Sequence, residues 1–221
     1  THATPAGFCV NSSKRSAQDD IAEMYLDLEF DVMMGGGNNF FDPKVRKDQK
    51  DLYAGFYAKG YQIARNKQEL LAAKNDKPIL GIFDEDAVPY AIDRLNSSAL
   101  SAKVPTLAEM AQKAIDRMKD HKKGFVLQIE SGKVDWAAHA NDIGGLIYDQ
   151  IAFDEAVKVA MDFAEKDGNT LVIITTDHGN ANPGVIYGKN ANDNFDSIHK
   201  YTNTNEVILN SFNSNTTASQ I

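Results

Sequence analysis

Apolar residues recur at intervals of three and four along two long stretches of the chain, and this spacing predicts amphipathic helices. The first stretch, from Thr106 to His121, opens with the capping pair Thr106 and Glu109. The second runs from about Ile143 to Lys166 and ends at Gly168, a residue that often terminates helices. Two shorter ranges show the same period, Ala17 to Leu28 and Gln68 to Lys74.

Four short, continuous apolar runs are typical of buried parallel strands. They cover Phe30 to Met34, Pro78 to Phe83, Gly124 to Ile129 and Thr170 to Thr175. Strands that alternate with helices indicate an α/β fold, a three-layer sandwich with a mostly parallel central sheet flanked by helices. The least regular stretch, Asp84 to Pro105, is predicted to be a surface insertion in a single domain that spans residues 1–221.

Composition narrows the class of partner. The chain has 31 acidic and 23 basic residues, a formal charge of −8, and no sustained basic run. Nucleic acid and anionic membranes are therefore not expected as partners. An acidic protein that handles phosphate needs local cations, which bound divalent metals can supply. Cys9 is the only cysteine, so an internal disulfide is excluded.

The two ends of the sequence suggest an interior piece of a longer chain. The start has no initiator Met, basic n-region or apolar h-region, so no signal peptide is expected. The end, from Ser211 to Ile221, is polar and has no capped element. We therefore expect a domain that is truncated at both ends.

A first group of polar residues follows the third apolar run. Asp135 and His139 are four residues apart and would share one face of a helix, so that a carboxylate oxygen and an imidazole nitrogen could bind one zinc ion. Glu130, at the end of the run, could bind a harder cation such as magnesium. The alternative interpretation is an aspartate that caps the N-terminus of a helix, with an incidental histidine one turn later, and taken alone the pair favours this alternative.

A second group, Asp177, His178 and Gly179, follows the fourth apolar run. Packing does not explain such polar residues at the carboxyl end of a strand. The alternative is a turn in which Asp177 accepts hydrogen bonds from backbone amides and His178 is exposed. Because ligands of open α/β sheets collect at the carboxyl ends of strands, the two groups together favour a metal site with several ions.

Several motifs, in this order and spacing, resemble the bacterial alkaline phosphatases. They are Thr1 to Ala6, Asp31 to Gly37 with its triglycine turn, Leu127 to Glu130, the pair Asp135 and His139, Asp154 to Val157, and Thr170 to His178. The resemblance covers most of Thr1 to Tyr187 and implies hydrolysis of phosphate monoesters at a site with two zinc ions and one magnesium ion.

The resemblance also implies residue roles. Asp135 and His139 would bind the first zinc ion, Asp177 and His178 the second, and Thr4 and Glu130 the magnesium ion. Arg15 would clamp phosphate, a role that suits the fork of a guanidinium group; its alternative is a solvated loop cation. His2 and Trp136 would tune the site from beside the ligands.

The family mechanism passes through a phosphoserine. The resemblance places that serine upstream of the Thr4 segment and a last zinc histidine well downstream of His178, near or beyond residue 221. We therefore expect no nucleophile and only part of each metal site in this chain, and we expect it to be inactive alone. Asp196-Ser197 and His199 stand in unmatched contexts. The family further implies a periplasmic or secreted parent protein and a homodimer.

Two other functions stay open at this stage. A cofactor-independent phosphoglycerate mutase, from the same superfamily, has a metal strand that reads like Thr176 to Asn180. The Glu130, Asp135 and His139 order and the Thr4 segment favour the phosphatase. A non-catalytic module that binds metal or phosphate is the third hypothesis.

Overall fold

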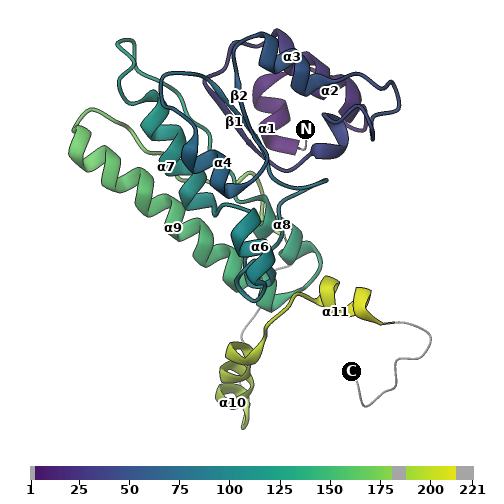
Figure 1. Cartoon of the computed structure of the whole chain (residues 1–221). Coiled ribbons are helices and arrows are strands. Elements are labelled where there is room, and N and C mark those ends of the chain that lie inside the picture. Colours follow the sequence, from purple (N-terminus) through teal and green to yellow (C-terminus); the bar gives the residue numbers. More distant parts are fainter. Residues whose placement is uncertain (1–2, 181–187, 213–221) are drawn as a thin grey trace.

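A parallel sheet of three short strands organises the first half of the protein. The computed structural model describes residues 3–180 and 188–212. Strands β1 (Val32–Gly35), β2 (Gln62–Ala64) and β3 (Ile79–Ile82) are arranged in the order β1-β3-β2, with Ile79 opposite both Val32 and Gln62. Helices cover both faces, which confirms the predicted α/β class (Figure 1).

Alternate residues of each strand enter two separate cores, as the period of two in a strand requires. Leu80 and Ile82 pack with residues of α1 (Ala3–Cys9), α2 (Gln18–Met24), the 3₁₀ turn η1 (Tyr25–Asp27) and α3 (Leu52–Ala58). Ile79 faces the other way, toward α4 (Lys67–Ala72) and α7 (Leu107–Met118). The rings of Phe56 and Tyr61 meet edge to face in the first core, 5.2 Å apart.

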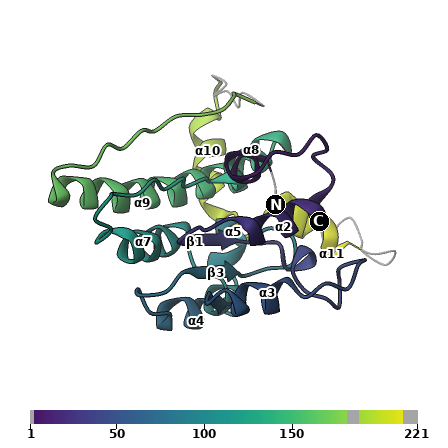
Figure 2. The same ribbon diagram turned by 90° about the horizontal axis from the view of Figure 1, so that it is seen from above.

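The two long helices form where the sequence predicts them. Thr106 accepts a hydrogen bond from the Glu109 amide and the Glu109 carboxylate accepts one from the Thr106 amide, so the capping box of α7 is complete. Helix α9 (Ile143–Asp167) ends at Gly168, whose φ of 68° lies in the left-handed region that glycine adopts at low cost. Figure 2 shows α9 on the β1 side of the sheet and α4 on the opposite side.

The irregular stretch between β3 and α7 contains buried structure. Its two short helices are α5 (Ala91–Leu95) and α6 (Ser98–Lys103). Ile92 and Val104 are fully buried, and Asp93 is also buried. Whether residues 84–105 are an insertion stays a prediction, but their middle forms part of the packed interior.

Two of the four predicted strands are wrong. In the part of the chain that the structure describes, residues 124–129 and 170–175 belong to no strand and pair with none. Val126 is 80% exposed and Leu171 is 82% exposed. An apolar, β-branched run only creates a preference for a strand, because the hydrogen bonds of a sheet must come from a partner. After α9 the chain instead runs back along that helix (Figure 2).

The last described elements are α10 (Ala191–Asp196), the 3₁₀ turn η3 (Ser197–Lys200) and α11 (Asn205–Ser211), which protrude from the body in Figure 1. The base of α11 is anchored: Asp93 accepts hydrogen bonds from the amide and the hydroxyl of Thr204, both at 2.8 Å. Asp142 accepts another from the Asn205 amide at 2.5 Å. None of the helices described here combines the length and apolar character needed to cross a bilayer.

Candidate metal centre

Helix α8 (Gly132–His139) carries the first pair of predicted ligands. Asp135 lies in its first turn and His139 at its last residue, so both side chains project from one face, as the spacing predicts. The Nε2 atom of His139 lies 3.4 Å from Oδ1 of Asp135.

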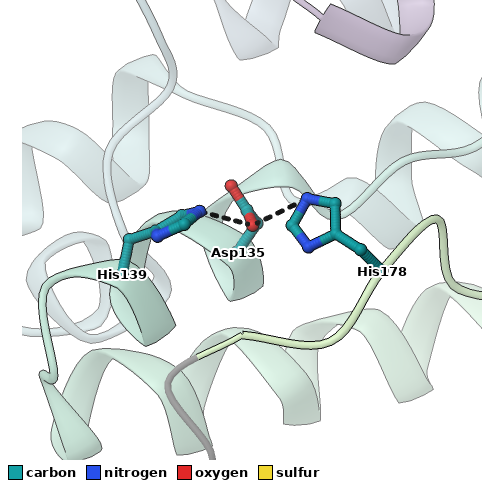
Figure 3. A group of neighbouring side chains, drawn as sticks. All are labelled: Asp135, His139 and His178. Atoms are coloured by element: carbon teal, nitrogen blue, oxygen red, sulfur yellow. Dashed lines mark ion pairs between the residues drawn. The ribbon is translucent and has the colours of Figure 1, made fainter.

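His178 reaches the same point from a distant part of the chain. It follows the extended segment after α9, and its Nε2 atom lies 3.7 Å from Oδ1 of Asp135. One ligand atom from each of Asp135, His139 and His178 lies within 4.8 Å of the other two. Figure 3 shows the two imidazoles on either side of the carboxylate. We call these three residues the triad.

Asn180 joins the two parts of the triad, a contact that sequence reasoning missed. Its side-chain amide donates to Oδ1 of Asp135 at 2.8 Å and to the backbone carbonyl of the same residue at 3.1 Å. The amide therefore ties α8 to the segment that carries His178 and orients the Asp135 carboxylate. The available signal was an amide two residues after a predicted ligand, which is too common to be specific.

Asp177 lies next to the triad and outside it. Its Oδ2 atom is 3.5 Å from Nε2 of His178, and the side chain is exposed. The structure thus brings His178 to the Asp135 and His139 pair, although the resemblance implies a different zinc ion for it. The division of the ligands between two zinc ions stays a prediction.

Glu130 and Thr4 form a further oxygen-rich contact. Partial burial raises the pKa of the Glu130 carboxyl group, and the negative charges of Asp177 and Asp135 raise it further. A hydrogen bond from the Thr4 side chain acts in the opposite direction. The two residues proposed for magnesium are therefore in contact, and their carboxylate and hydroxyl oxygens are ligands suited to a hard cation.

The remaining predicted residues have different outcomes. Arg15 lies in an exposed turn between α1 and α2, and within residues 3–180 and 188–212 no hydrogen bond or ion pair joins it to the triad. Trp136 is half-buried, and the ammonium group of Lys133 lies 3.9 Å from the centre of its ring. His2 lies outside the described residues.

The donors of the triad fit a divalent transition metal. Two imidazole nitrogens and one carboxylate oxygen are ligand types that zinc accepts, and a site with three protein ligands keeps a position for water or substrate. His139 and His178 are about half exposed or more, at 63% and 51% of their side chains, so the site is open to solutes. Asp177 and Glu130 add negative charge that favours a cation.

Comparison with known proteins shows the family of the chain. A family model described as alkaline phosphatase matches residues 1–220. The chain belongs to the alkaline phosphatase family. Alkaline phosphatase 4 of Bacillus subtilis (strain 168) is 38% identical over 200 residues, which cover 88% of this chain and 41% of that protein. Alkaline phosphatase of Escherichia coli (strain K12) is 31% identical over 227 residues, with coverages of 89% and 48%.

The fold is similar over almost the whole chain. The crystal structure of Thermus thermophilus alkaline phosphatase matches with a TM-score of 0.91 and 38% identity, covering 99% of this chain and 46% of that one. The chain therefore spans less than half the length of these relatives. The matches confirm the family and the fold class, and they do not favour the mutase hypothesis.

Proposed function

We propose that the chain contributes metal ligands to an alkaline-phosphatase-type phosphomonoesterase, an enzyme that hydrolyses phosphate monoesters of small molecules. The observation that supports this most directly is the convergence of Asp135, His139 and His178, whose ligand atoms lie within 4.8 Å of one another although the residues come from segments far apart in sequence. Family membership supports the reaction class.

The triad residues would hold zinc, and Asp177 would extend the site toward a second zinc ion. Thr4 and Glu130 would hold magnesium. Bound divalent ions supply Lewis-acid polarisation of phosphoryl oxygens. The two-zinc, one-magnesium stoichiometry and the phosphoserine intermediate, on the serine that the resemblance places upstream of the Thr4 segment, belong to this proposal.

The chain's own residues prepare the site before any ion arrives. Asn180 holds the Asp135 carboxylate, and the triad imidazoles face that carboxylate with their Nε2 atoms. The open rim admits a phosphate ester. Without bound cations, the carboxylates of Asp135, Asp177 and Glu130 would repel the doubly negative charge of this ester. Arg15 would add a positive charge on the substrate side if its turn approaches the site. A periplasmic or secreted location and a homodimer are proposed for the whole protein by analogy with the family.

Zinc binding to the 221-residue chain tests the proposal. Competition with a chromogenic chelator measures the affinity of the wild type, of His139→Ala and of His178→Ala. Each substitution should weaken zinc binding by at least about tenfold, since even residues that only support metal ligands contribute that much. His199→Ala removes an exposed histidine from η3 and is the matched control.

Equal zinc affinity in the wild type and both triad variants would reject the metal centre. For the activity, the full-length protein should hydrolyse p-nitrophenyl phosphate at alkaline pH and lose that activity with a chelator. Activity that is indifferent to chelation would reject the metal-dependent mechanism.

A further inference from the structure

The first turn of α8 lacks the features that usually stabilise a helix start. Ser131, at the N-cap, makes no side-chain capping bond, and Gly132, the first helical residue, has a low helix propensity. The buried residues of α8 are Ala137 and Ala138, both in its second half. Asp135 lies in this first turn, where the two hydrogen bonds from Asn180 hold its carboxylate and its backbone carbonyl.

Lys133 makes a second tertiary contact from the first turn. Its Nζ atom lies 4.1 Å from the centre of the Tyr90 ring and 3.9 Å from the centre of the Trp136 ring. Trp136 is one turn along the same helix, whereas Tyr90 precedes α5. The ammonium group therefore connects α8 to another element through its contacts with two ring faces, a geometry in which a cation is attracted to the ring electrons.

The Tyr90 end of this contact is firmly placed. Tyr90 is 7% exposed and belongs to a small core with Ile92 and Ala137. The next amide, that of Ala91, donates to Oδ2 of the buried Asp149 of α9 at 3.1 Å. The ring that receives the ammonium group is thus fixed to the longest helix of the protein.

The charges around Lys133 favour the same position. Burial lowers the pKa of the Lys133 ammonium group, and the attraction of four carboxylates, those of Glu206, Asp149, Asp86 and Asp93, opposes this change. Two of them, Asp149 and Asp93, are buried. An uncharged residue at position 133 would lose the attraction of a cation to the two rings and to these carboxylates.

We propose that Lys133 is a positioning residue for the metal centre: its ammonium group, lying over the Tyr90 and Trp136 rings, holds the first turn of α8 so that the Asp135 carboxylate faces His139 and His178. The metal part of this inference rests on the proposed function. The placement of the helix turn does not, because it concerns the chain without metal.

Trp136 provides a direct spectroscopic test, because it is the only tryptophan in the sequence. In the metal-free chain, Lys133→Met keeps an unbranched side chain and removes the charge. The Trp136 fluorescence anisotropy should fall as the ring gains freedom, and the emission maximum should shift. Lys133→Arg retains a cation that stacks on rings and should restore both signals. Lys158→Met, which removes an exposed charge from α9, is the control.

Zinc affinity supplies the second measurement. Lys133→Met should weaken zinc binding by about tenfold, the lower end of the effect of residues that orient metal ligands, and Lys133→Arg should recover most of it. If Lys133→Met fails to fold, Tyr90 gives the same test: Tyr90→Phe keeps the ring and should match the wild type, whereas Tyr90→Leu should reproduce the loss.

The outcomes separate the two proposals. A wild type that binds no zinc overturns the proposed function, and the anisotropy then decides the placement of the helix turn. A wild type that binds zinc, with unchanged anisotropy and unchanged affinity in Lys133→Met or Tyr90→Leu, overturns the role of Lys133. A loss that Lys133→Arg does not restore also overturns it, because the position would then require lysine for a reason other than its cation.

Discussion

The buried carboxyl group of Asp149 should make the protein less stable as the pH rises. Asp149 is 6% exposed on α9 and accepts a hydrogen bond from the Ala91 amide. Desolvation raises its pKa to about 6, although this hydrogen bond and the nearby Lys133 charge oppose the change. In the unfolded chain an aspartate has a pKa near 3.9, so the folded state holds the proton more strongly.

The sign and the size of the effect follow from linkage. Below about pH 4 the group is protonated in both states and costs nothing. As the pH rises through 4 to 6 the unfolded chain loses its proton first, and the free energy of unfolding falls. Above pH 6 the cost is constant. A pKa difference of about two units corresponds to about 3 kcal/mol.

Asp149→Asn should remove this cost, because an amide has the same shape, keeps an acceptor for the Ala91 amide and carries no charge. If its NH₂ group finds no hydrogen-bond acceptor, the variant loses about 1–2 kcal/mol of stability. We therefore expect the variant to be about 1–3 kcal/mol more stable than the wild type at pH 8. At pH 4 the advantage should vanish, and the variant should be equal to the wild type or up to about 2 kcal/mol less stable.

Urea unfolding of the metal-free chain, followed by far-UV circular dichroism from pH 4 to pH 8, measures the difference. The contributions of titratable groups that both proteins share cancel in this difference. Asp154→Asn, an exposed substitution on the same helix, is the control and should change stability little at any pH. A difference between Asp149→Asn and the wild type that is independent of pH, or a variant less stable at pH 8, would refute the reasoning.

Two further predictions concern the site and the exposed segments. Asn180→Ala removes both hydrogen bonds to Asp135 and should weaken zinc binding about tenfold. Asn190→Ala is the control, because the Asn190 side chain caps no helix, and it should leave the affinity unchanged. Equal affinities in the two variants would contradict the positioning of Asp135 by Asn180. Replacing Leu171 and Ile173, which are 82% and 75% exposed, by lysine should lower binding of the dye ANS and slow aggregation of the 221-residue chain, and unchanged dye binding would show that these side chains are covered.

Local patterns predicted the two long helices, α7 and α9, because their stabilising contacts are local, whereas short helices such as α3 and α6 were not predicted. The Thr106 and Glu109 capping box and the Gly168 terminus depend on residues within one turn, and both form as expected. Strand β3 lies within its predicted run, and β1 overlaps the run from Phe30 to Met34 and ends one residue beyond it. The runs after Gly124 and Thr170 have equally apolar sequences, but no partner among the described residues supplies the hydrogen bonds of a ladder.

The candidate site also has a part that local spacing predicts and a part that depends on tertiary packing. The spacing of Asp135 and His139 alone placed them on one helix face, since both positions are set by the helical period. The arrival of His178 beside them and the two hydrogen bonds from Asn180 depend on how α9 and the segment after it return across the protein. The contact of Lys133 with Tyr90 likewise joins distant segments, since it depends on how α8 packs against the residue that precedes α5.

The sequence by itself therefore determined the family, the parallel α/β class and the residue types of a metal centre, because order, period and chemical character are written along the chain. Only the tertiary structure decided which of those residues meet, which side chains hold them and which apolar runs stay unpaired. Contacts between distant segments depend on the packing of helices and sheet as a whole, and no local pattern contains that information.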